Sequence, residues 1–166
     1  TGSGTNVSFT ALADINISGS LTIGPGTTFT ASSFTHTVAG NFLNNGTFAG
    51  AGSTIVLNGP VAQSVYSGNS FHKLTINATG GTVNLLTDIT INDTLAFVLG
   101  KIITGSYKVI LNSTATVSGA SQASGWVAGF LQKNITSGLN ISRIFEVGDN
   151  NIYAPSSFIL GNVSAP

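Results

Sequence analysis

Few side chains in this sequence could carry out acid–base or nucleophilic chemistry. The chain has no Cys and only two His, and neither His36 nor His72 lies in a recognisable catalytic motif. A nucleophile needs an adjacent base, and a thiolate zinc site or a disulfide framework needs cysteines. We expect His36, which falls at an inward position of a strand, to be a partly buried structural residue, and His72 to be solvated.

The acidic residues are equally sparse. Polysaccharide-cleaving β-helix enzymes need clusters of carboxylates, often binding calcium, together with a Lys or Arg base. Asp88 and Asp93 are close in sequence, but no third group completes a site. The other acids are scattered: Asp14, Glu146 and Asp149. We therefore expect no enzymatic activity, no catalytic residues, no cofactor and no metal site.

The strongest modification signal is the triplet Asn-x-Ser/Thr, the acceptor motif for N-linked glycans. Nine of the sixteen Asn residues begin this triplet. Three of them, Asn77, Asn92 and Asn112, each end a copy of a repeated short strand. If these copies stack on one another, glycans on neighbouring copies would crowd each other. We expect any glycans at the remaining six: Asn6, Asn16, Asn45, Asn134, Asn140 and Asn162.

A short strand that ends at Asn or a small residue recurs along the chain. The clearest copies are residues 14–18, 54–58, 73–77, 88–92 and 108–112, and weaker copies are 35–39 and 124–128. Their last positions are 15 to 21 residues apart. A period of that size with strand alternation is typical of a solenoid, in which no repeat can bury its apolar face alone.

Within each copy the apolar residues alternate with polar ones. Pairs such as Ile55 and Leu57, or Leu74 and Ile76, share one parity and should point inward. A second strand should follow in each coil, over residues 20–23, 41–43, 63–66, 82–85, 94–97 and 114–117, with Gly-rich segments between the strands. The sequence therefore predicts an all-β fold: a right-handed parallel β-helix of about seven coils.

Stacking the clearest copies would create two columns of equivalent residues. The first is a ladder of amides, Asn58, Asn77, Asn92 and Asn112, whose side chains can bond their own backbone or each other. The second is a charge column, four residues earlier, in which Asp88 should lie between Lys73 and Lys108. Alternating charge would discourage register slips between coils.

The final thirty residues differ from the rest. Charge reappears at Arg143, Glu146 and Asp149, and the strand repeat fades after Ile135. A terminal coil needs a cap, because a bare end exposes core and strand edges. We expect β-helix coils over residues 1–136 and a C-terminal cap, or the start of an attached β element, over 137–166.

Composition narrows the classes of partner. Charged residues are 6% of the chain and the formal net charge is +0. Binding to nucleic acid or to an anionic membrane depends on clustered positive charge, so neither is expected. No stretch of 18 apolar residues occurs, and we expect no membrane insertion. Near-zero net charge favours self-association. Because the chain begins at Thr1 without Met or a signal segment, we expect a processed or excised piece.

Residues 34–48, followed by 55–59, 63–65 and 71–77, resemble β-helix regions of large Bacteroidota surface proteins exported by the type IX secretion system. Residues 95–100, 125–130 and 145–148, with Tyr153 and Pro155, are similar to the way such regions end. The resemblance implies a right-handed parallel β-helix in a long adhesin-like or fibrous protein. Asp93-Thr94-Leu95 also looks like an O-glycosylation motif associated with that phylum, which makes Thr94 a further candidate site.

The sequence thus predicts a non-enzymatic structural module of an extracellular or cell-surface protein. It would be an adhesin spacer, in contact with neighbouring domains of a longer chain, or a fibre subunit that binds copies of itself. The alternative is a module that binds glycans or a surface polysaccharide. Candidate aromatic platforms for a glycan are Tyr66, Tyr107, Trp126 and Tyr153.

Overall fold

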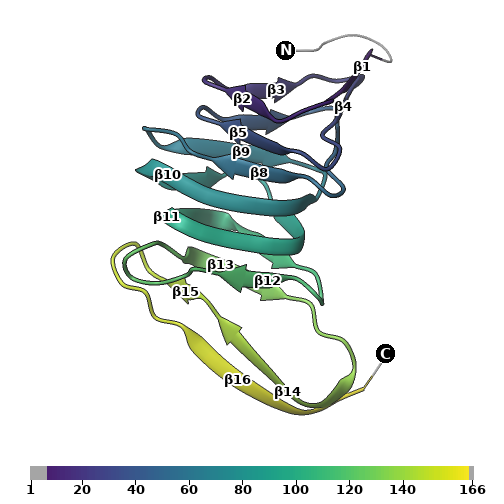
Figure 1. The fold of residues 1–166 in the computed structure, drawn as a ribbon. Helices are drawn as coiled ribbons and strands as arrows, with labels where there is room; N and C mark the ends of the chain where they lie inside the picture. The colour runs from purple at the N-terminus through teal and green to yellow at the C-terminus, as the bar shows by residue number, and fades with distance from the viewer. Residues whose placement is uncertain (1–6, 165–166) are drawn as a thin grey trace.

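The computed structural model describes residues 7–164, and every regular element in that range is a β-strand (Figure 1). The strands follow in the order β1 (Val7–Thr10), β2 (Ile15–Ile17), β3 (Leu21–Ile23), β4 (Thr27–Thr30), β5 (Thr35–Val38), β6 (Phe42–Asn44), β7 (Thr47–Ala49), β8 (Thr54–Leu57), β9 (Gln63–Ser67), β10 (Phe71–Leu85), β11 (Ile89–Leu111), β12 (Thr116–Ser118), β13 (Val127–Lys133), β14 (Gly138–Phe145), β15 (Val147–Gly148) and β16 (Ser156–Val163).

The strands from β1 to β13, with β15, stack into three faces, and every pairing between coils is parallel. Face 1 consists of β2, β5, β8, residues 73–76, residues 94–96 and β12. Face 2 consists of β3, β6, β9, the end of β10, residues 101–103, the start of β13 and β15. Face 3 begins with β1, β4 and β7 and ends with residues 108–111 and 130–133. The predicted parallel β-solenoid of about seven turns is confirmed.

Alternation decides which side chains form the core. The inward residues predicted from the sequence, such as Ile55, Leu57, Leu74 and Ile76, are fully buried. Each lies beside its equivalent on the next coil, since Ile55 pairs with Leu74 and Leu57 with Ile76. One inward column is aromatic, because the rings of Phe9, Phe29, Phe48 and Phe71 follow each other at centroid distances of 5.6, 6.1 and 5.6 Å.

Several of the buried polar side chains satisfy backbone groups at the corners of the coil. His36 accepts a hydrogen bond from Ile15 N at Nδ1, so its Nε2 carries the proton and donates to Ala31 O, 2.9 Å away. Gln63 accepts from Gly59 N and donates to Val38 O at 2.9 Å. The sequence predicts that His36 is partly buried, and the structure instead buries it completely.

Two glycines allow adjacent coils to approach at one corner. Gly100 and Gly125 both have positive φ, at 99° and 144°. A Cβ on Gly125 would lie 1.9 Å from the carbonyl oxygen of Gly100. Only glycine fits this contact, because no side-chain atom can be accommodated so close to a backbone oxygen.

The predicted register is correct as far as residue 77 and wrong beyond it. On face 1, Lys73 pairs with Thr54 on one side and with Thr94 on the other. The strand at residues 73–77 is therefore followed on the next coil by residues 94–97, and not by residues 88–92. Residues 88–92 and 108–112 instead stack on each other on face 3, where Asn112 N donates to Ile91 O. The coil has three strands with the same alternation, and alternation alone does not distinguish one face from another.

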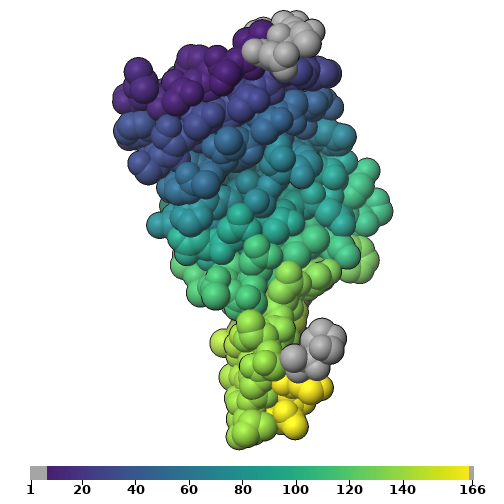
Figure 2. Space-filling view, turned by 90° about the vertical axis from the view of Figure 1, so that its right-hand side faces the viewer, coloured from purple at the N-terminus to yellow at the C-terminus, as the bar shows by residue number. Residues whose placement is uncertain are grey.

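The C-terminal part leaves the coil stack. β14 and β16 form an antiparallel hairpin that projects from the last coil as a narrow extension (Figures 1 and 2). The hairpin begins at Gly138, close to the predicted boundary, but β15 returns to pair with β13 on face 2. Both hairpin strands carry exposed apolar residues, including Leu139 and Ile159 at 73% exposure each.

Replacing Phe71 with Ala should destabilise the protein by about 3–5 kcal/mol, because a fully buried ring is removed from the aromatic column. The measurement is the urea midpoint of unfolding, followed by circular dichroism. The matched control is Val98→Ala, at a position that is 57% exposed and should change stability by no more than about 0.5 kcal/mol. Similar losses for both variants would contradict the assigned register.

Candidate functional site

The described residues contain no group of three or more His, Cys, Asp or Glu side chains arranged to hold a metal ion. His72 lies on the surface, with its Nε2 3.5 Å from Asp93 Oδ2. Lys73 Nζ lies 3.5 Å from the same oxygen. Lys73 and Asp93 form a partly exposed ion pair, which contributes about 0–1 kcal/mol.

The predicted charge column is therefore wrong in one of its members. Asp88 and Lys108 lie on adjacent coils, and Asp88 Oδ1 accepts a hydrogen bond of 3.0 Å from the backbone N of Lys108. Lys73 belongs to face 1 and pairs with Asp93 instead. Asp14 makes the same contact as Asp88, with Thr35 N at 2.9 Å, so the Asp at a corner orders the first residue of the next coil.

The predicted amide ladder is also divided between two faces. On face 3, Asn112 Nδ2 donates to Asn92 Oδ1, and Asn92 Nδ2 donates to Ser70 Oγ at 2.9 Å. Asn134 extends this ladder by donating to Asn112 Oδ1 at 3.4 Å. Asn58 and Asn77 are not part of it, because they follow the strands of face 1. Asn58 Oδ1 is buried and has no hydrogen-bond partner among the described residues.

The structure separates the candidate glycosylation sites by exposure. Asn16, Asn45, Asn134, Asn140 and Asn162 are exposed, while the three predicted to remain unmodified, Asn77, Asn92 and Asn112, are half-buried. Thr94 is half-buried too, and its hydroxyl donates to Asp93 Oδ1 at 3.1 Å. Asn6 lies outside the described residues.

The four candidate aromatic platforms do not present a common surface. Trp126 is 3% exposed, so the idea that it is an exposed platform is wrong. Its ring packs against Tyr153 at a centroid distance of 5.9 Å, and Lys101 Nζ lies 5.0 Å from the ring centre. Tyr66 and Tyr107 are partly exposed at separate positions, on β9 and within β11.

Trp126 is held by a turn that follows β15. Its Nε1 donates to Asp149 O at 2.8 Å. The Asp149 carboxylate accepts from Asn151 N and Ile152 N, and these bonds, Asn151 first, lower its pKa below the ordinary value. Burial, followed by the nearby Glu146 charge, raises the pKa of Tyr153. This cluster fixes the last coil where the chain turns into β16.

An ion pair joins the hairpin to the coil stack. Lys133 Nζ lies 2.7 Å from Glu146 Oε2, and both side chains are largely buried. The ammonium also lies 5.8 Å from the centre of the Phe145 ring. Val147 and Leu131 pack against the core beside this pair. The base of the hairpin therefore crosses the C-terminal end of the solenoid.

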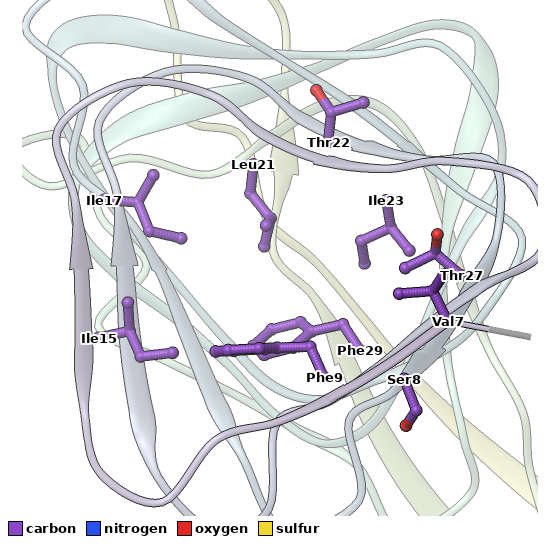
Figure 3. A pocket seen from close by; sticks show the side chains of 10 residues that line it. All are labelled: Val7, Ser8, Phe9, Ile15, Ile17, Leu21, Thr22, Ile23, Thr27 and Phe29. Carbon is purple, nitrogen blue, oxygen red and sulfur yellow. The ribbon is translucent and has the colours of Figure 1, made fainter. Parts of the chain in front are cut away.

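The N-terminal end has no comparable cover among the described residues. β1, β2 and β3 each pair with a strand of the coil below and with no other strand in residues 7–164. A hollow of about 400 Å³ opens there, lined mainly by apolar side chains. Figure 3 shows the rings of Phe9 and Phe29 one over the other, with Ile15, Ile17 and Leu21 facing the same interior. Phe9 is 56% exposed.

This open end is the candidate functional site. Strand edges at the ends of a solenoid are expected from the sequence pattern, but the strands β1, β4 and β7 of face 3 are not among its predicted copies. The available signal was the recurrence of Phe at residues 9, 29 and 48, with spacings close to one coil.

No protein-family model matches this chain, and no curated protein or solved structure is significantly similar to it. Residues 7–164 include no helix that is long and apolar enough to span a membrane.

Replacing Asn112 with Ala should cost about 1–2 kcal/mol, because it leaves the amides of Asn92 and Asn134 without their partner. Urea unfolding measures the loss. Asn58→Ala is the matched control, since Asn58 Oδ1 makes no bond that could be lost. An equal loss in the control would show that the amide contacts of face 3 contribute nothing specific.

Replacing Asp149 with Ala should shift the fluorescence of Trp126, the only Trp, to longer wavelength because the turn that covers its ring loosens. Asp149→Asn keeps an oxygen acceptor and should retain the native emission at pH 7.

In the unmodified chain the same shift should appear on acidification. A carboxylate with a lowered pKa stabilises the fold above its unfolded value of about 4, and that stabilisation is lost as the pH falls through the lower folded value. A transition at neutral pH would contradict this assignment.

Proposed function

We propose that this chain is a non-enzymatic structural module of an extracellular surface protein, and that it acts as a stiff spacer. The observation that supports this most directly is the difference between its two ends. Among residues 7–164, strands β1, β2 and β3 at the N-terminal end each have one unpaired edge over an open apolar interior, whereas the base of a hairpin crosses the C-terminal end.

The body between the ends suits a spacer. Successive coils pair along faces 1 and 2, and β1, β4 and β7 also pair on face 3, so bending the stack would break many backbone hydrogen bonds together. The outward residues are chiefly uncharged, and five Asn-x-Ser/Thr sites are exposed. Glycans at those sites would keep a chain of low charge soluble outside the cell.

The difference between the ends favours a spacer over a fibre subunit. A fibre built by stacking identical copies coil on coil needs two complementary open ends. The pair of Lys133 and Glu146 holds the hairpin base across the end that a second copy would have to meet. A glycan-binding role has less support, because Trp126 is buried and Tyr66 and Tyr107 lie apart.

Light scattering and electron microscopy of the purified chain test this proposal. We expect short, unbranched particles that do not grow into filaments as the protein concentration is raised from roughly 1 to 100 µM, a range that covers typical weak self-association. Filaments with an axial repeat of one solenoid would show a fibre subunit and would overturn the spacer proposal. Phe9→Asp is the control variant: it should dissolve filaments built through the N-terminal end and leave spacer particles unchanged.

A further inference from the structure

The strands at the open N-terminal end have the same kind of edge that forms backbone hydrogen bonds between successive coils elsewhere in the structure. The backbone N–H groups of outward residues point to the preceding coil, as in Thr54 N to Phe34 O and Asn58 N to Val38 O. By the same register, the N–H groups of Ser8, Asn16 and Thr22 face the open side. Three strand edges therefore offer hydrogen bonds around one apolar hollow.

The corners of the first coil show which hydrogen-bond acceptors a partner has to supply. In the coil below, Thr35 N donates to Asp14 Oδ1 and Asn41 N donates to Ser20 Oγ, so side chains of the upper coil serve the backbone of the lower one. Asp14 and Ser20 occupy these positions in the first coil, and their own N–H groups face the open side. A partner must therefore bring acceptors to these two corners.

The apolar interior of the first coil determines which side chains a partner needs. Phe9 lies at the exposed end of the aromatic column, 5.6 Å from Phe29. Ile15, Ile17 and Leu21 are half-exposed, while their equivalents on the next coil, His36, Val38 and Phe42, are fully buried. The missing contact is thus apolar at four inward positions and polar at the corners, which is the chemistry of one more coil.

We propose that the N-terminal end is a joint that accepts one further parallel β-coil of about twenty residues. This coil carries apolar side chains over Phe9, Ile15, Ile17 and Leu21, and hydrogen-bond acceptors over Asp14 and Ser20. The inference rests on the proposed spacer function and specifies which kind of partner continues the spacer.

A second copy of the chain fits this end less well. Two N-terminal ends meeting face to face would oppose the corner N–H groups of both copies. The Asp14 and Ser20 side chains could not serve them, because they are bound to Thr35 and Asn41 below. The C-terminal end of a second copy is crossed by its hairpin base. The occupant is therefore a coil whose lower edge is free.

The test is a full-length chain in which residues 7–26 are duplicated in tandem. Val7 pairs with Thr27, so a twenty-residue duplication places each new residue over its original. Amide hydrogen exchange at the original Ser8, Asn16 and Thr22 should slow at least about tenfold, because these groups become internal. The matched control carries the same duplication with the new copies of Phe9, Ile15, Ile17 and Leu21 changed to Ser, and it should show no slowing.

Two results would overturn the proposal that the N-terminal end is a joint. One is equal exchange in the duplication and its control, which would show that the end does not accept a coil. The other is a concentration-dependent dimer of the original chain that Phe9→Asp abolishes, which would make a second copy the occupant. Neither result depends on filament formation, so failure of the joint is distinguishable from failure of the spacer proposal.

Discussion

The structure depends on the register between successive coils. Each inward side chain must lie on its equivalent one coil away, because no single coil has enough apolar surface to fold alone. A shift of one residue would turn the core outward and expose the polar face inside. The contacts at the corners, such as Thr35 N to Asp14 Oδ1 and Gln63 Nε2 to Val38 O, hold this register by tying side chains of one coil to the backbone of another.

The same constraint explains where charge and polarity are found. A stack of equivalent positions repeats any charge about every 4.8 Å, so like charges in a column repel and uncharged Thr, Ser and Asn are favoured outside. Side-chain amides can bond along the stack, as Asn92, Asn112 and Asn134 do. Buried polar residues such as His36 are tolerated because both ring nitrogens are paired.

In a solenoid the strands inside the stack have neighbours on both sides, but the strands of the end coils do not. In this protein the two ends differ in how they are covered. At the C-terminal end the chain crosses the last coil through Glu146, which pairs with Lys133, and continues as a hairpin. At the N-terminal end the outer edges of β1, β2 and β3 are unpaired within residues 7–164, and Phe9 is exposed. An exposed row of backbone donors and acceptors is a template for adding strands. Any function in assembly is therefore directional.

The sequence by itself determined the class of fold and the inward residues. These follow from local alternation and its repetition, which are visible within a few residues at a time. Only the tertiary structure decided which strands are neighbours. It placed Asn92 and Asn112 apart from Asn58 and Asn77, and it paired Lys73 with Asp93 rather than Asp88. The physical reason is that three faces share one alternation, so the number of residues at each corner, and not the pattern within a strand, sets which side chains meet.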